Sequence, residues 1–466
     1  GKYDRIPVII SFDRSVRPDN FQQKKRSERR ARLVEALRAE SRATATRWTG
    51  VIAQAGGRKS KSLWVRNAIA VELSASSISR LAGLGGIRRI DFDATILATD
   101  TTVAAQTQTE WNIDLINAPA LWQLGVTGAG ATVASMDTGA DALHLDLKSS
   151  QRTGLGNWFD PHGVYAAPHD SSGHGTQTIG LMVGGDATGS RIGVAPGANW
   201  IAAKIFDDAG QAQISDIELA FQWLLDPDGD PQTDDAPDVV NNSWGYSAQV
   251  NECNPIFQES FDLLRAANVA VVFAAGNTGP GAATSIGPAN TPGAFSVGSI
   301  DDASNLNVSS FSARGPGACT PGIAFPAVVA PGRNIKTADL TFGFNPNATI
   351  IVSGTSFAAP QVAGAIALLA SAFPEKTVDE LEAALRSSAH DLGTAGADND
   401  YGAGVIDVRA AFIALGGVAV ADSDGDGVGV PDDCNDNDAS IHPGANEVVG
   451  DGIDQDCNGF DLTISV

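Results

Sequence analysis

Five short and almost continuous apolar runs alternate with helical patterns between residues 105 and 415, and this alternation limits the possible folds more than any other feature. Short runs that are apolar on both faces are typical of parallel strands covered by helices on both sides. We therefore predict an α/β fold with ligand sites beyond the carboxyl ends of its strands. The expected strands are 131–136, 200–206, 238–242, 269–274 and 294–300, and the expected helices are 175–184, 214–225, 256–267, 356–372 and 377–388.

Residues 1–100 follow another pattern, in which strands and helices alternate over a much shorter length. An apolar stripe at Leu33, Val34 and Leu37 runs along an otherwise basic helical segment. The order of the elements predicts a small α+β domain. In chain order we expect a strand at 6–12, a helix at 20–54, a strand at 63–73, a helix at 74–84 and a strand at 87–96.

Charge is distributed unevenly over the 466 residues, whose formal net charge is −23. Residues 1–100 hold 20 of the 31 Lys and Arg residues and 10 of the 54 Asp and Glu residues, a net charge of +10, which leaves −33 on the other 366. The two parts are expected to attract each other. The acidic majority argues against nucleic acid as a partner, because phosphate binding needs basic groups; the basic run fits a solvated helix face or an acidic protein partner better. No apolar run reaches the roughly 18–20 residues of a membrane span.

Four widely spaced cysteines form no Cys-x-x-Cys pair. An even number of this kind favours two disulfides in an oxidising compartment over zinc or redox chemistry. Spacing favours the pairs Cys253–Cys319 and Cys434–Cys457, although four cysteines allow three connectivities. Because the sequence starts at Gly1 without an apolar leader, we expect that any signal peptide has been removed.

Three motifs place reactive side chains at the expected ends of strands and helices. Asp137 follows the strand at 131–136, whereas His174 and Ser356 each open a helix. A serine hydroxyl is a poor nucleophile until an imidazole accepts its proton, and the imidazole needs a carboxylate to fix its tautomer and stabilise its cation. Asn277, after the strand at 269–274, offers an amide to a developing oxyanion.

The motifs Asp-Thr-Gly, His-Gly-Thr, Ala-Ala-Gly-Asn and Gly-Thr-Ser-Phe-Ala-Ala-Pro, in this order, resemble those of the subtilisin-like serine peptidases, the subtilases. The resemblance covers about residues 105–415 and implies a subtilisin-like parallel sheet and serine endopeptidase activity. It further implies that Asp137 orients the imidazole, His174 is the general base and acid, Ser356 is the nucleophile and Asn277 is the oxyanion donor.

The segment from Val240 to Gly245 resembles the substrate-binding strand of this family. The resemblance implies that a peptide substrate pairs with this strand through main-chain hydrogen bonds. Because no charged side chain falls in 243–245 or 274–278, we expect a broad preference for apolar residues at P1, the position before the scissile bond. Alternatively, Trp244 is simply part of the core. The expected substrate-binding residues are Ser243, Trp244, Gly245, Ala275 and Gly276.

Residues 1–100 resemble the inhibitory propeptide of the subtilases, a small ferredoxin-like α+β domain. The resemblance implies an intramolecular inhibitor that covers the catalytic domain and is cut off by self-cleavage somewhere in Leu97–Gln106. An unrelated basic domain is the alternative interpretation.

The tail at 421–466 contains 12 Asp and Glu residues, no Lys or Arg, and two of the cysteines. Its aspartates have the spacing of an EF-hand-like calcium loop, and hard oxygen ligands favour Ca²⁺ over zinc. The tail also resembles the acidic Asp/Cys metal-binding repeats at the ends of many secreted microbial proteins; a solvated acidic tail is the alternative. The expected metal ligands are Asp422, Asp424, Asp426, Val428 and Asp433 in a first loop and Asp454, Asp456 and Asn458 in a second.

Two further places in the central domain are candidates for Ca²⁺. Asp146 matches a calcium ligand of the family, and Asp186 is a weaker candidate. The acidic segment at 226–231 is either a solvated turn or a further calcium site.

Together these features predict a secreted, monomeric serine endopeptidase made as a zymogen, with structural Ca²⁺ and no organic cofactor. Its substrates are expected to be proteins or peptides. The expected domains are an inhibitory propeptide at 1–100, a catalytic domain at 105–415 and a calcium-binding module at 421–466. Two rival interpretations are a calcium-dependent surface-attachment protein and an acid-acting relative that uses Glu and Asp in place of His; the glycine-flanked His174 argues against the second.

Overall fold

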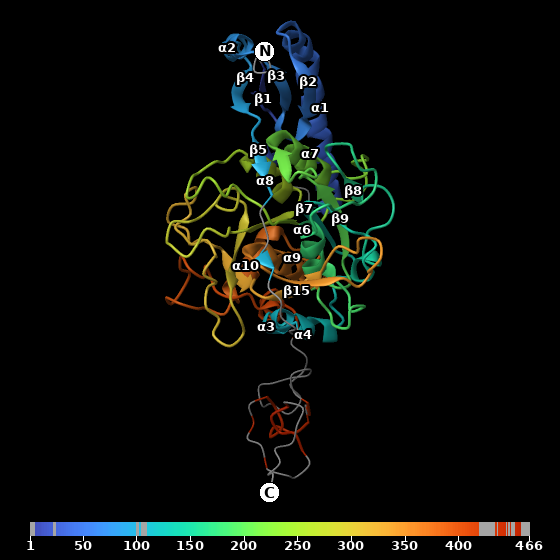
Figure 1. Ribbon diagram of the computed structural model, residues 1–466, viewed down its shortest axis with the longest axis vertical. Helices are drawn as coiled ribbons and strands as arrows, with labels where there is room; N and C mark the ends of the chain where they lie inside the picture. The colour runs from blue at the N-terminus through green and yellow to red at the C-terminus, as the bar shows by residue number, and fades with distance from the viewer. Residues whose placement is uncertain are drawn as a thin grey trace.

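The computed structural model describes residues 5–21, 25–98, 102–103 and 110–418, together with 434–435, 437–443, 445, 448 and 453–457 near the C-terminus. Figure 1 shows a small N-terminal domain placed against a larger α/β domain on the side of α7 (Ile214–Leu224) and α8 (Gln258–Ala266). The predicted tail ligands Asp422, Asp424, Asp426, Val428, Asp433 and Asn458 lie outside the described residues.

The larger domain is built on a seven-stranded sheet in which all neighbouring strands are parallel. This confirms the predicted α/β fold, and each of the five expected strands is present. Two further strands, β8 and β14, form the ends of the sheet. The strand order is β14 (Val328–Pro331), β13 (Phe295–Ile300), β12 (Ala270–Ala274), β11 (Val239–Asn242), β7 (Thr132–Asp137), β9 (Asn199–Lys204), β8 (Trp158–Phe159).

Side chains of the central strands alternate between two apolar cores, because successive residues of a strand point to opposite faces. In β12, Ala270, Val272 and Ala274 pack in the core that contains α6 and α9. Val271 and Phe273 pack in the core that contains α7 and α8. The helices of the first face are α6 (His174–Val183), α9 (Thr355–Ala372), α10 (Val378–Ser387) and α11 (Val408–Ala414), with the short α3 (Trp111–Leu115), α4 (Ala118–Gln123) and α5 (Leu145–Lys148) nearby.

Helix α9 runs through the middle of the first core. Among the described residues it is the one helix long and apolar enough to cross a membrane, but 89% of it is buried inside the protein. A buried position explains why this helix is apolar all round.

The N-terminal domain has the order β-α-β-β-α-β and an antiparallel sheet β2-β3-β1-β4, which confirms the predicted ferredoxin-like fold. Ile9, Leu37 and Val65 of this domain join the core around α7 and α8. The domain therefore packs directly on these two helices. Its elements are β1 (Ile6–Phe12), α1 (Arg26–Gln54), β2 (Arg58–Leu63), β3 (Ala68–Leu73), α2 (Ala75–Ala82) and β4 (Ile87–Phe92), with a 3-10 turn at Pro18–Asn20.

The expected strands at 63–73 and 87–96 are wrong as single strands. A 3-10 turn at Trp64–Arg66 separates β2 from β3, because Val65 and Arg66 are buried there rather than continuing a pleated strand. The second strand stops at Phe92, and the Asp93 carboxylate accepts a hydrogen bond from the Ser215 N–H of α7 at 2.8 Å. The chain then resumes as β5 (Thr95–Leu97) on the larger domain.

A separate three-stranded antiparallel sheet has the order β15 (Ile335–Ala338), β16 (Thr349–Ser353), β6 (Thr102–Val103).

Disulfides join Cys253 to Cys319 and Cys434 to Cys457, which confirms both pairs that spacing favoured.

Candidate active site

Asp137 and His174 are brought together by two glycines that follow them. A Cβ on Gly175 would lie 2.1 Å from the Gly139 carbonyl oxygen, and a Cβ on Gly139, at φ +132°, would lie 1.9 Å from the His169 carbonyl oxygen. Only glycine permits this approach of two backbones. The end of β7 and the start of α6 therefore meet, and His174 Nδ1 lies 2.7 Å from Asp137 Oδ1.

The imidazole of His174 is buried and has one free nitrogen. Because an ionised carboxylate only accepts hydrogen bonds, Nδ1 carries the proton toward Asp137, and Nε2 has no hydrogen-bond partner among the described residues. Burial lowers the pKa of His174, but the charge and hydrogen bond of Asp137 and the charge of Asp170 outweigh it, so this pKa is raised above 6.5. Nε2 is thus left as the proton acceptor.

Ser356 lies in the first turn of α9, one residue before Phe357, whose ring packs 5.6 Å from the His174 ring. Its Oγ donates to the Ser243 carbonyl at 3.3 Å, and no hydrogen bond joins Ser356 Oγ to His174 Nε2 among the described contacts. Catalytic hydrogen bonds of this kind often form only when substrate is bound. The N-terminus of an 18-residue helix also favours negative charge near Ser356.

Asn277 follows β12 and is held by the residue before the serine. Its Oδ1 accepts hydrogen bonds from the Thr355 N–H at 3.0 Å and the Thr355 hydroxyl at 2.9 Å. Because both contacts use the oxygen, the Nδ2 of this exposed side chain remains available as a donor. Asn277 and Ser356 line the same cavity, so an oxyanion formed at Ser356 would have this donor nearby.

That cavity has a volume of about 320 Å³ and contains no charged side chain. Ser243, Trp244, Gly245 and Gly276 line it, as predicted, whereas Ala275 is fully buried and does not. The Trp244 side chain is only 2% exposed, so its ring belongs to the core. The ring packs against the rings of Phe206, Phe257 and Phe273.

Asp170 is a buried residue of this site that the sequence analysis missed. One of its oxygens accepts hydrogen bonds from the Thr138 hydroxyl and from the N–H groups of Ser172 and Gly173, and the other accepts from the N–H and hydroxyl of Thr176. Asp170 thereby ties the residue after Asp137 to the first turn of α6. The run Asp-Ser-Ser-Gly ahead of His174 is a turn signature that could have indicated a turn at Asp170, but not its contact with Thr138.

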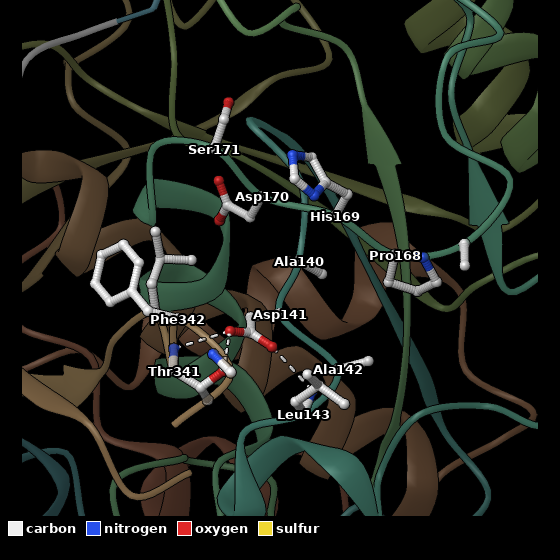
Figure 2. Close-up of a pocket in the computed structure, with 13 residues that line it drawn as sticks. Ala140, Asp141, Ala142, Leu143, Pro168, His169, Asp170, Ser171, Thr341 and Phe342 are labelled. Carbon is white, nitrogen blue, oxygen red and sulfur yellow. Dashed lines mark hydrogen bonds between the residues drawn. The ribbon is translucent and has the colours of Figure 1, made fainter. Parts of the chain in front are cut away.

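Asp170 also borders a second cavity, of about 600 Å³ (Figure 2). The figure shows His169 and Ser171 on one side and Phe342 on another, with the Asp141 carboxylate hydrogen-bonded to the N–H and hydroxyl of Thr341. This cavity is lined by neither Ser356 nor Asn277.

The end of the N-terminal domain lies in the Ser356 cavity. Strand β5 pairs antiparallel with β10 (Gln211–Gln213), and the Ala98 N–H donates to the Gly210 carbonyl at 2.7 Å. Leu97 and Ala98 line the cavity beside Ser356. Further along the chain, Thr102 pairs with Ser353, three residues before the serine.

The predicted metal ligands of the central domain have different surroundings. Asp146 is buried; its Oδ1 accepts the Ala187 N–H at 2.6 Å, while its Oδ2 has no hydrogen-bond partner among the described residues. Asp186 is exposed and pairs with Arg191 at 3.1 Å. Because the Ala187 N–H donates to one carboxylate oxygen of Asp146, only the other oxygen is free for a cation. The role of Asp146 as a calcium ligand stays a prediction.

The acidic segment at 226–231 contributes to a cluster of three carboxylates. Ligand atoms of Asp226, Asp228 and Asp235 lie within 4.8 Å of one another, and Arg38 of the N-terminal domain pairs with Asp226. Burial raises the pKa of Asp235 to about 6. In the tail, Asp454 and Asp456 are described and lie three residues and one residue before Cys457, which forms a disulfide with Cys434.

The chain is similar in sequence to known proteins. A model of the subtilase family matches residues 128–404, and a family described as "Putative metal-binding motif" matches residues 433–461. The chain is 37% identical over 330 residues to bacillopeptidase F of Bacillus subtilis, a match that covers 66% of this chain and 22% of that protein. It is 33% identical over 303 residues to subtilisin DY of Bacillus licheniformis, covering 65% and 97%. It is 29% identical over 365 residues to subtilisin E of Bacillus subtilis, covering 78% and 84%.

A parallel α/β sheet that carries an Asp–His pair, a helix-opening serine and a neighbouring asparagine defines a serine endopeptidase. The chain belongs to the subtilase family. This confirms the predicted resemblance and the predicted enzyme class.

Proposed function

We propose that this subtilase is a secreted endopeptidase made as a zymogen, in which Asp137, His174 and Ser356 form the catalytic triad and Asn277 donates to the oxyanion. The observation that carries the proposal is the 2.7 Å contact between His174 Nδ1 and Asp137, which leaves Nε2 unpaired and ready to accept a proton. Two disulfides favour an oxidising, extracellular setting.

In the first chemical step, Ser356 Oγ attacks the substrate carbonyl carbon and its proton passes to His174 Nε2. Asp137 stabilises the resulting imidazolium, while Asn277 Nδ2 donates to the oxygen that becomes negative. His174 then returns the proton to the leaving amine, and an acyl-enzyme remains on Ser356. A water molecule, deprotonated by His174, hydrolyses this ester and restores the serine.

We propose peptide substrates with apolar P1 residues, since no charged side chain lines the cavity next to Ser356. The pairing of β5 with β10 offers a pattern for substrate binding, in which an extended peptide adds a strand to the enzyme. If P1 is the residue that follows Ala98, Ile96 lies three residues before P1. Because Ile96 is buried at the centre of the β5–β10 pairing, we propose that the enzyme also prefers an apolar substrate residue at this position.

We propose that residues 1–100 are the inhibitory propeptide and that the enzyme is a monomer. The positions of β5 and β6 support a narrower cleavage region, because Ala98 lines the Ser356 cavity and Thr102 pairs with Ser353, three residues before Ser356. The scissile bond is expected between these two residues. Sequencing the N-terminus of the processed protein tests this placement.

We further propose that the tail binds Ca²⁺, which is a common ligand of subtilases. The oxygen ligands expected are the aspartates of 421–466. Chelation should lower the thermal midpoint of the Ser356→Ala chain, and the variant Asp424→Asn/Asp426→Asn should respond less. An equal response in both would move the calcium site elsewhere, with Asp146 as the next candidate.

An active-site-directed fluorophosphonate tests the catalytic assignment. It should label the processed protein and fail on the Ser356→Ala variant, because the reagent needs the activated hydroxyl. Ser310→Ala is the matched control and should be labelled like the wild type. Labelling that persists in Ser356→Ala would refute the assignment.

A further inference from the structure

One arginine of the N-terminal domain is buried inside the larger domain. Arg30, on α1, is 2% exposed. Its Nε donates to the Ala267 carbonyl at 2.7 Å; its Nη1 donates to Asp234 at 2.8 Å and to the Ala236 carbonyl at 2.9 Å. Its Nη2 donates to the carbonyls of Pro237 at 2.9 Å and Asn268 at 3.5 Å. All five N–H groups of the guanidinium thus have an acceptor.

The acceptors form a carbonyl cage, which we define as the backbone carbonyls of Ala236, Pro237, Ala267 and Asn268 with the Asp234 carboxylate. Two segments supply it: the loop before β11 and the end of α8. The carbonyls that follow a helix carry the negative end of its dipole, so the end of α8 favours a cation, and the loop before β11 adds the negative charge of Asp234. None of these residues lines the Ser356 cavity.

The cage fits a guanidinium better than an ammonium. A lysine has three donors on one nitrogen and cannot reach five acceptors spread around a planar fork. Burial lowers the pKa of Arg30 to about 10, with Arg26 lowering it further and Asp234 and Asp238 opposing, so the side chain stays charged at neutral pH. A buried charge is tolerated only when its hydrogen bonds are satisfied, which this cage achieves.

Three other cross-domain contacts lack these properties. Lys61 pairs with Asp216, and Arg88 pairs with Glu259. The side chains of the two basic residues are 35% and 40% exposed, respectively. Arg66 is fully buried against Glu218, but its Nε and Nη2 have no hydrogen-bond partner among the described residues. The carbonyl cage therefore binds its cation more completely than these neighbours do.

We propose that the catalytic domain carries a guanidinium-binding site, the carbonyl cage, which Arg30 fills in the precursor and which sets how long the cleaved propeptide stays bound. The inference rests on the proposed zymogen function. Its ligand is an arginine side chain, first that of the enzyme's own propeptide. Once the propeptide leaves, the same cage is open to a small guanidinium compound.

The first test follows self-cleavage and peptidase activity of the full chain in parallel. Arg30→Lys keeps the charge but leaves carbonyls unpaired, so the delay between cleavage and full activity should shorten at least about tenfold, since hydrogen bonds to charged groups are each worth roughly that factor or more. Arg32→Lys, at an exposed position of the same helix, should leave the delay unchanged. Equal delays for Arg30→Lys and the wild type would overturn the proposal.

The second test needs no variant and separates the cage from ionic screening. About 50 mM ethylguanidinium should shorten the delay of the wild type more than ethylammonium at the same ionic strength, because the two cations differ in donor geometry. Equal effects would overturn the guanidinium specificity.

Failure of the proposed function has a different signature. A wild-type chain that does not cleave itself would refute the zymogen proposal, and the cage would then be tested by thermal unfolding of the intact chain. Arg30→Lys should lower the midpoint of thermal unfolding more than Arg32→Lys does. Equal midpoints for the two variants would overturn the proposal that the carbonyl cage binds a guanidinium specifically.

Discussion

The Ser356 centre and the contact between the N-terminal domain and α7 and α8 are built in opposite ways. The centre depends on the identity of a few side chains, each at the end of a strand or the start of a helix, with Asp137 and His174 in direct contact. The contact depends on many cations of one domain that meet carboxylates and backbone carbonyls of the other. The proposed chemistry thus requires particular residues, whereas the proposed inhibition draws on apolar packing, summed charge and backbone geometry.

The largest expected effect separates these two regions. His174→Ala should lower kcat by about 10⁵–10⁶-fold, the scale of loss when the base of such a triad is removed. Steady-state hydrolysis of a peptide with an apolar P1 residue measures it. His390→Ala, at an exposed position, is the control and should retain activity. A His174→Ala enzyme within tenfold of the wild type would show that this imidazole is not the base.

A second effect concerns the buried ion pair between the domains. Arg66 and Glu218 are both fully buried, 2.8 Å apart, and Ser260 also donates to Glu218. Arg66→Met leaves Glu218 buried without its cation, so the unfolding free energy of the Ser356→Ala precursor should fall by about 3–5 kcal/mol. Denaturant unfolding of the intact precursor measures this change.

Arg89→Met provides the matched control for this pair. Arg89 is 45% exposed and pairs with Asp91 of its own strand, so its loss should change the unfolding free energy by about 1 kcal/mol or less. If the two variants lost equal unfolding free energy, burial of the Arg66–Glu218 pair would add nothing to its contribution to stability.

The third effect returns to the centre. Asn277→Ala should lower kcat by about 10²–10³-fold with little change in KM, because the amide is proposed to act on the oxyanion and not on the bound substrate. The variant also loses the contacts of Asn277 with Thr355, and its thermal midpoint controls for the structural effect of that loss. A raised KM at unchanged kcat would instead assign Asn277 to substrate binding.

The same contrast explains how far the sequence could predict the molecule. Asp137, His174, Ser356 and Asn277 could be predicted as site residues because each lies in a short motif next to a strand or helix whose pattern is strong. The carbonyl cage around Arg30 could not be found, because backbone carbonyls leave no mark in a sequence. Asp170 was missed for a different reason: its turn signature was present, but only the fold shows that the turn touches the end of β7.

The two wrong strands of the N-terminal domain have a related cause. Arg66 lies in an apolar run that predicts a continuous strand at 63–73. In the structure Arg66 is part of a 3-10 turn, where it forms a buried ion pair with Glu218, 152 residues away in the sequence. The break after Phe92 likewise follows from a contact with α7, made by Asp93. Long-range contacts of this kind override local pattern.

The smallest expected effect is a dependence on pH that distinguishes the centre from the interface. His174 must be neutral to accept a proton, and its pKa lies above 6.5 because Asp137 favours the cation more than burial opposes it. Activity of the mature enzyme should therefore rise with pH through a midpoint above 6.5 and then level off. In Asp137→Asn, whose residual activity is low, the midpoint should move to lower pH, since burial then acts on the imidazole without the carboxylate charge.

Release of the cleaved propeptide should behave differently between pH 7 and 9. The proposed propeptide, residues 1–100, contains no histidine, the side chain whose ordinary pKa lies nearest to this range. The delay between cleavage and full activity should therefore stay constant between pH 7 and 9, whereas kcat/KM should follow the titration of His174. A delay that tracked the activity profile would mean that one titrating group controls both regions, and the separation between centre and interface would not hold.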